Sequence, residues 1–134
     1  MMRTAIDTNV LLDVLLPDVE HEKESLALLG KAVSQGSLCI CEVVAAELGA
    51  QFPDVESMER FLKGVGIAIT GMSLLAVHDA GRRWREYARK RRGARERVVA
   101  DFVIAAHALH AADRLLTRDL GFYRTYFKDL KLLQ

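Results

Sequence analysis

The chain has 134 residues, a length that favours one domain, and 51% of them are hydrophobic, which is enough for a core without disulfides. The formal net charge is only +1, and the longest uncharged stretch, residues 64–77, is too short to cross a bilayer, which needs about 20 apolar residues. The two cysteines, Cys39 and Cys41, have no further Cys or His at ligand spacing, so we interpret them as core residues rather than as a zinc site. Asp7 and Asp13 interrupt the apolar start, so no signal peptide is expected. We therefore expect a cytoplasmic protein that does not associate with membranes.

The apolar runs and helical periodicities give a consistent order of elements. In chain order they predict a strand over residues 3–6, helices over 9–16 and 22–34, a strand over 38–41, a helix over 42–51, a helix that Asp54 caps, a strand over 67–69, helices over 73–92 and 98–112, and strands over 114–117 and 131–133. Strands that alternate with helices favour a parallel sheet that is covered on both faces. We predict an α/β fold with a single domain over residues 1–134, in which helices flank a short central parallel β-sheet on both faces.

Four carboxylates lie in or beside apolar runs: Asp7, Glu47, Asp101 and Asp119. An ionised carboxylate is costly to bury unless a cation compensates it. Four such positions in a small domain therefore indicate a shared divalent cation. A set of oxygen ligands without His or Cys favours a hard cation, Mg²⁺ or Mn²⁺. With water and a substrate phosphate, such an ion supports hydrolysis of a phosphodiester.

Two of these acids also have a simpler interpretation. Asp7 precedes Thr8 at the start of a helix, where both residue types are favoured as N-caps. Asp119 lies in the turn-forming sequence T-R-D-L-G. If the strand over 114–117 continues, however, Thr117 and Asp119 point to the same side. The sequence leaves both interpretations open.

The other two acids are harder to explain as structural residues. Helical geometry places Glu47 at the centre of the apolar face of the helix over 42–51, where an unpaired Glu is rare. Asp101 lies in the first turn of an otherwise apolar helix. The helix dipole stabilises an acid there by about 0.3–1 kcal/mol, which is less than the cost of burial. We therefore favour a functional role for both.

Residues 82–97 form a basic segment, in which nine of sixteen residues are Lys or Arg. Four arginines recur at helical spacing and predict a surface for RNA phosphates: Arg82, Arg85, Arg89 and Arg92. Trp84 and Tyr87 either stack on unpaired bases or belong to the core, and we favour the core. We interpret His107 and His110 likewise as core or rim residues.

The ordered motifs IDTNVLLDVL, VVAAEL, ADFVIAAHALHAADRLLTRD and GFYRTYF resemble those of the PIN-domain ribonucleases. In length and layout the chain is most similar to the VapC-like toxins of toxin–antitoxin pairs. The resemblance covers essentially the whole chain and depends on the order and spacing of all four motifs. After Asp119, where relatives often place another acid, this chain has Gly121, Phe122 and Tyr123, which leaves open whether one ion or two are bound.

The resemblance implies a set of functional residues and partners. The metal-binding and catalytic acids would be Asp7, Glu47, Asp101 and Asp119. Thr117 would position a water or a substrate oxygen, and Asn9 would orient Asp7 or its water. The resemblance further implies an endoribonuclease that depends on Mg²⁺ or Mn²⁺, forms a homodimer and is silenced by a cognate antitoxin protein.

Our leading hypothesis is therefore a metal-dependent endoribonuclease whose RNA substrate contacts the arginine segment and Arg118 beside the site. A haloacid-dehalogenase-like phosphatase is a rival, since Asp7 follows the first strand. Its usual second Asp is Asn9 here, however, and no lysine follows the fourth strand. A second rival is a non-catalytic PIN-like module that binds RNA or a protein partner.

Overall fold

The structure is a computed structural model that describes residues 1–16, 20–90 and 98–133. The strands are β1 (Met2–Ile6), β2 (Gly36–Ile40), β3 (Ile67–Ile69), β4 (Arg114–Leu116) and β5 (Leu132–Leu133). The helices are α1 (Thr8–Leu15), α2 (Glu22–Gln35), α3 (Glu42–Gly49), α4 (Val55–Val65), α5 (Leu74–Lys90), α6 (Val99–Ala111) and α7 (Leu120–Tyr126). Within these residues, no helix has the length and apolar composition that crossing a membrane requires.

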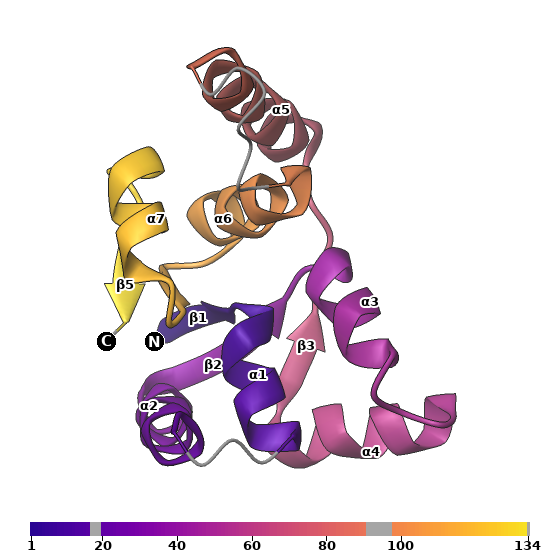
Figure 1. The fold of residues 1–134 in the computed structure, drawn as a ribbon. Helices are drawn as coiled ribbons and strands as arrows, with labels where there is room; N and C mark the ends of the chain where they lie inside the picture. The colour runs from indigo at the N-terminus through magenta and orange to yellow at the C-terminus, as the bar shows by residue number, and fades with distance from the viewer. Residues whose placement is uncertain (17–19, 91–97, 134) are drawn as a thin grey trace.

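The five strands form one parallel sheet in the order β3-β2-β1-β4-β5. The chain builds outward from β1 to β3 and then returns to place β4 on the other side of β1. Because parallel crossovers are right-handed, this return puts the later helices on the opposite face of the sheet. Figure 1 shows α1, α2 and α4 on one side of the sheet and α5, α6 and α7 on the other. The predicted fold class, a parallel sheet flanked by helices on both faces, is confirmed.

The core lies on both sides of the central strands. Ile6, Ile40 and Leu116 are fully buried, as expected for parallel strands that helices cover on both faces. Helix α6 packs against the sheet through small residues, among them Ala105 and Ala108, which have no exposed surface. These short side chains let the helix backbone approach β1 and β4 closely. Cys39 and Cys41 are buried thiols within this core, as predicted.

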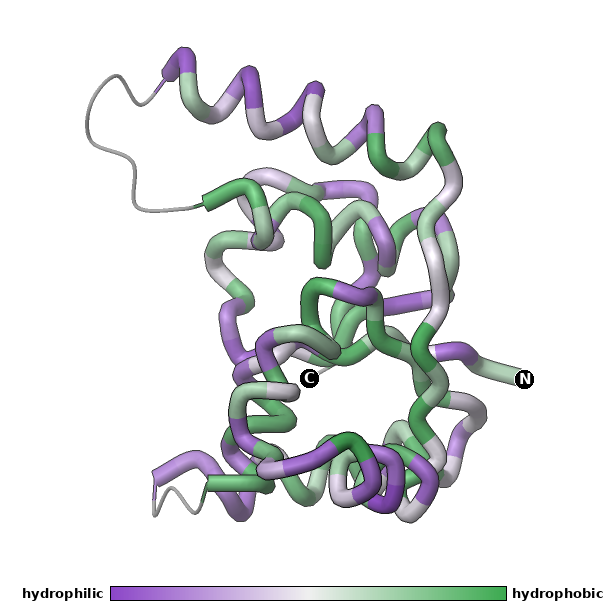
Figure 2. Tube along the Cα trace, turned by 90° about the vertical axis from the view of Figure 1, so that its right-hand side faces the viewer, coloured by the Kyte–Doolittle hydropathy of each residue, from purple (hydrophilic) through white to green (hydrophobic). Residues whose placement is uncertain are grey.

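Helix α5 is the outermost helix and packs on α6. Figure 2 shows that hydrophilic residues recur along the tube of this helix, between hydrophobic ones. Its inner face carries Tyr87, which is 2% exposed, and Trp84, whose ring lies 5.6 Å from that of Phe102 in an edge-on contact. The core interpretation of these two aromatic residues is therefore confirmed.

Every predicted strand and helix is present, and the described bounds lie within two residues of the prediction. One element, α7, is absent from the prediction. Its sequence, LGFYRTY, contains a glycine and residues of modest helix propensity. The helix is stabilised instead by its aromatic side chains, because Phe122 packs edge-on against Phe102 of α6 at 5.4 Å. Tertiary packing thus decides this element, and local sequence does not.

Candidate functional site

A cavity of about 270 Å³ opens at the carboxyl end of the sheet, beside the first residues after β1 and β4. This is the topological switch point, where ligands bind in open parallel sheets. All four predicted acids line this cavity, and they come from four separate segments of the chain: Asp7, Glu47, Asp101 and Asp119. Its other walls are Thr8, Asn9, Leu12, Val98, Ala100 and Ile104. No Lys or Arg of the described residues lines it.

The backbone places two of the acids directly. The amide of Asp7 donates to the carbonyl of Leu116 at 2.9 Å, so the pairing of β1 with β4 extends to this residue. Asp7 is also the N-cap residue of α1, but its side chain makes no capping hydrogen bond. Asp119 holds the corresponding position before α7, again without a side-chain cap. The capping interpretation therefore does not account for either carboxylate.

Three side chains donate hydrogen bonds to the same oxygen of Asp7. Oδ2 accepts from the hydroxyl of Thr117 at 2.8 Å, from the phenol of Tyr123 at 3.0 Å and from the amide of Asn9 at 3.4 Å. No described side chain donates to the other oxygen, Oδ1. All three side-chain donors thus fix the carboxylate through Oδ2, and a hydrogen bond from the backbone of Thr8 also stabilises its charged form.

The pKa of Asp7 is raised, because burial penalises its charged form. The hydrogen bonds from Thr117 and Tyr123 oppose this rise, and the negative charge of Asp101 adds to it. The pKa of Tyr123 is also raised, first by its own burial and then by the charge of Asp7. Tyr123 therefore remains a protonated donor, and burial disfavours the charged form of Asp7, which a bound cation would stabilise.

Thr117 links the first and last acids. Its hydroxyl donates to Asp7 and accepts from the amide of Asp119 at 3.0 Å. Asn9 connects the same two segments, since its side-chain oxygen accepts from the amide of Arg118 at 3.4 Å. These bonds hold the segment after β4 against the start of α1.

The predicted burial of Glu47 is wrong, because this residue is exposed. The buried positions of α3 are Val44, Ala45 and Leu48, and Glu47 lies at the rim of the cavity. Most residues of α3 are apolar, so helical periodicity alone does not show which side of this helix is covered by the rest of the protein. Glu47 is nonetheless oriented, since its Oε1 accepts from the hydroxyl of Thr8 at 2.7 Å.

Asp101 is the third residue of α6 and is half-buried. Its Oδ2 accepts a hydrogen bond from the backbone amide of Val98 at 3.3 Å, which satisfies a donor at the helix start. Asp101 thus combines a capping contact with a position on the cavity wall.

The donor set fits a hard cation that keeps part of its water. All four charged groups are carboxylates, the ligands that Mg²⁺ and Mn²⁺ prefer. Across residues 1–16, 20–90 and 98–133, no group of three or more His, Cys, Asp or Glu side chains is arranged to hold an ion by itself. Mg²⁺ typically binds through one or two carboxylates and several waters, which matches acids spread around a shared cavity.

The family model of the PIN domain matches residues 4–128. The chain belongs to the PIN-domain family. No curated protein matches the sequence of this PIN domain.

Among solved structures, this PIN domain resembles VapBC2 from Rickettsia felis bound to a DNA fragment from their promoter. The TM-score is 0.71 and the identity 22%, over 98% of this chain and 97% of the other. For VapBC-1 from nontypeable Haemophilus influenzae the TM-score is 0.69 and the identity 21%, over 98% of this chain and 96% of the other. For DNA-bound VapBC from Salmonella typhimurium the TM-score is 0.65 and the identity 21%, over 98% of this chain and 97% of the other. These likenesses support the fold.

The arginines that were predicted to bind RNA are only partly available in this PIN domain. Arg118 pairs with the buried Asp13 through two hydrogen bonds, at 2.6 and 3.0 Å, so its guanidinium is engaged inside the protein. Arg82 pairs with Asp79 at 2.8 Å and with Glu86 at 3.4 Å. Arg85 and Arg89 are exposed on α5, and Arg92 lies outside the described residues. A role in RNA binding stays a prediction for all of them.

Tyr123 is the site residue that the sequence did not reveal. Its phenol reaches Asp7, which lies 116 positions earlier in the chain. The available signal was a tyrosine four residues after Asp119, one helical turn from an acid. His107 is 1% exposed and bonds Thr70 at 2.7 Å, which confirms that it is a core residue.

Proposed function

We propose that this PIN domain is a divalent-metal-dependent endoribonuclease and the toxin of a VapC-type toxin–antitoxin pair. The observation that carries the proposal is the single cavity in which Asp7, Glu47, Asp101 and Asp119 meet, with no Lys or Arg of the described residues in its wall. Membership of the PIN-domain family supports a nuclease. The likeness to VapBC assemblies supports an antitoxin protein as the partner. The proposal places the protein in the cytoplasm, and the homodimer stays a prediction.

The proposed roles follow from charge and geometry. Carboxylates that surround the cavity repel an RNA phosphate, so the substrate approaches only when a cation balances their charge. When bound, Mg²⁺ or Mn²⁺ supplies Lewis acidity towards the phosphodiester and the attacking water. Thr117 and Tyr123 fix the orientation of the Asp7 carboxylate, which lines the cavity, by donating to its Oδ2.

Glu47 is the most exposed member of the set, and Thr8 fixes the position of its carboxylate. We assign it the uptake of the proton that the attacking water releases, because a general base must be close to the reacting water and able to exchange protons with solvent. Arg85 and Arg89 on the outer helix supply positive charge for the RNA backbone, with a binding strength that falls as salt rises.

The test is cleavage of total RNA by the purified protein with Mg²⁺ or Mn²⁺. We expect discrete fragments that disappear in EDTA and in Asp7→Asn. Glu56→Gln, which removes an exposed carboxylate on α4, is the matched control and should cleave like the wild type. Intact RNA from a folded protein that is free of copurified inhibitor would favour the non-catalytic binding module instead.

A further inference from the structure

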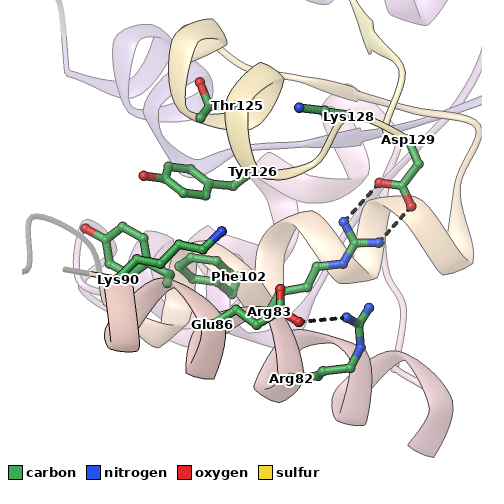
Figure 3. Close-up of a pocket in the computed structure, with 10 residues that line it drawn as sticks. Arg82, Arg83, Glu86, Lys90, Phe102, Thr125, Tyr126, Lys128 and Asp129 are labelled. Carbon is green, nitrogen blue, oxygen red and sulfur yellow. Dashed lines mark hydrogen bonds and ion pairs between the residues drawn. The ribbon is translucent and has the colours of Figure 1, made fainter. Parts of the chain in front are cut away.

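A second hollow, of about 380 Å³, lies between α5 and α7 and is separate from the carboxylate cavity. Figure 3 shows that side chains of α5 line one side of it and side chains at the end of α7 line the other. The buried ring of Phe102 from α6 forms part of its wall. Its volume is within the range of roughly 300–1,000 Å³ that is usual for small-molecule sites.

The cations around this hollow fall into two groups. Arg83 is neutralised, because it makes a bidentate pair with Asp129 at 2.9 and 2.7 Å. Arg82 is paired with carboxylates of its own helix. Lys90 and Lys128 form no ion pair within the described part of the chain. Figure 3 shows the amino group of Lys90 directed into the space between the two helices and Lys128 beside α7. The lining of the hollow thus holds four cationic side chains against two carboxylates, Glu86 and Asp129, which leaves it with an excess of positive charge.

An aromatic ring stands beside these two lysines. Tyr126, the last residue of α7, is half-buried and lines the hollow. Behind it, Tyr87 holds the ring in an edge-on contact at 5.2 Å and 88°. A ring fixed in this way offers a stacking surface to a base, and stacking on aromatic side chains is a standard mode of single-strand RNA binding.

The hollow and the carboxylate cavity share two helices. Asp101 and Phe102 are neighbours on α6, and each lines one of the two sites. Asp119 precedes α7 and Tyr126 ends it, so the two sites are separated by roughly 10 Å along that helix, at 1.5 Å per residue. One strand of RNA is long enough to occupy both.

We infer that this hollow binds one nucleotide of the RNA strand that flanks the cleavage site. Lys90 and Lys128 contact its phosphates, and Tyr126 stacks on its base. An excess of positive charge beside an aromatic ring favours a nucleotide over an acidic peptide, because an acidic peptide would need the positive charge alone. The inference rests on the proposed ribonuclease function and adds to it a position for the flanking strand.

Binding of a labelled, mixed-sequence single-stranded RNA in EDTA, followed by fluorescence anisotropy, tests the inference without cleavage. Lys90→Ala combined with Lys128→Ala should weaken binding about 10-fold or more. It should also lower the slope of log K against log salt by about 1.4, which corresponds to about 0.7 for each lost phosphate contact. The matched control, Lys23→Ala combined with Lys31→Ala, removes the same charge from exposed positions on α2. It should change affinity less than about 2-fold, because salt screens exposed charges that do not contact the RNA.

Tyr126→Leu tests the stacking contact. It should weaken binding of the RNA by at least about 5-fold, but leave binding of an abasic strand of the same length unchanged. A merely structural role of the ring would affect both strands equally, and that result would overturn the stacking assignment. Circular dichroism confirms that each variant is folded.

The outcomes separate the inference from the function on which it rests. Unchanged affinity and salt slope in the double lysine variant would overturn the inference, whether or not the protein cleaves RNA. Loss of binding to oligoglutamate with unchanged RNA affinity would also overturn it, in favour of an acidic protein partner. RNA binding that depends on both lysines, in a protein that leaves RNA intact with Mn²⁺, would support the nucleotide site and overturn the ribonuclease.

Discussion

The carboxylate cavity and the ion-pair cluster around Asp79 differ in how their charges are balanced. Asp79 of α5 accepts hydrogen bonds from Arg82 at 2.8 Å, from Arg83 at 3.0 Å and from His110 at 2.8 Å. Asp7 accepts its side-chain hydrogen bonds from neutral groups, two hydroxyls and an amide. One aspartate is surrounded by basic donors and the other by neutral donors.

The pKa values of these two aspartates move in opposite directions. Burial raises the pKa of both carboxyl groups. At Asp79 the hydrogen bonds from His110, Arg83 and Arg82 outweigh burial and lower the pKa to about 2. At Asp7 burial prevails. The charge of Asp79 therefore stabilises the fold, whereas burial disfavours the charge of Asp7, as expected for a group that binds a cation.

The largest expected effect is that a substitution in the carboxylate cavity lowers the rate of RNA cleavage without lowering the stability of the fold. Asp101→Asn should lower the rate of RNA cleavage by roughly 10² to 10⁴-fold, the usual range for a catalytic carboxylate. Its unfolding temperature in EDTA should be unchanged or higher, because the substitution removes repulsion with Asp7 and the amide oxygen still accepts from Val98. Cleavage kinetics and thermal unfolding measure the two quantities. Full activity would exclude Asp101 from the site.

Asp79→Ala should show the reverse pattern. Loss of its hydrogen bonds to charged partners should lower the free energy of unfolding by about 1.5–3 kcal/mol. Cleavage well below the unfolding temperature should remain near the wild-type rate. The control is Glu59→Ala, which breaks the exposed pair with Lys63 and should cost about 0.5 kcal/mol or less. Urea unfolding of both variants checks the prediction, and equal costs would contradict it.

Tyr123→Phe sharpens the comparison within the cavity. The substitution keeps the buried ring and removes only the hydrogen bond to Asp7. Because the phenol orients the carboxylate that would bind the ion, Mn²⁺ affinity should fall about 10-fold or more, whereas cleavage at saturating Mn²⁺ should recover in part. Mn²⁺ titration of binding and activity measures this split. Tyr87→Phe, in another buried tyrosine, should leave the affinity unchanged.

The smallest expected effect is a change in the free energy of unfolding as the pH falls into the acidic range. The pKa of Asp79 is lower in the folded state than its ordinary value of 3.8, so its stabilising contribution is complete above about pH 4. This contribution is lost as the pH falls towards 2. The stability of Asp79→Ala should therefore change less than that of the wild type between pH 4 and 2, as urea unfolding across this range would show. Parallel curves would contradict the assignment.

Much of the fold was predictable because its signals are local. Apolar runs marked the strands, and Asp54 was correctly predicted to cap α4, where its Oδ1 accepts from the amide of Ser57 at 2.7 Å. The meeting of Asp7 and Asp119 also followed from the sequence, since parallel strands end at the same edge.

The features that were missed depend on contacts between distant segments. Helix α7 forms because its rings pack on α6, and the role of Tyr123 depends on a partner at the other end of the chain. The exposure of Glu47 depends on which side of α3 its neighbours cover. The pairing of Arg118 with Asp13 likewise joins residues that are 105 positions apart. No periodicity within one element contains this information.

The central claim is that the carboxylate cavity binds a divalent cation. Anomalous diffraction from crystals of the protein soaked in Mn²⁺ tests it most directly. The account predicts a Mn²⁺ ion in the cavity, about 2.1 Å from Oδ1 of Asp7, with water and at least one further carboxylate among its ligands. An ion that binds only elsewhere, in crystals whose protein cleaves RNA with Mn²⁺, would contradict the account.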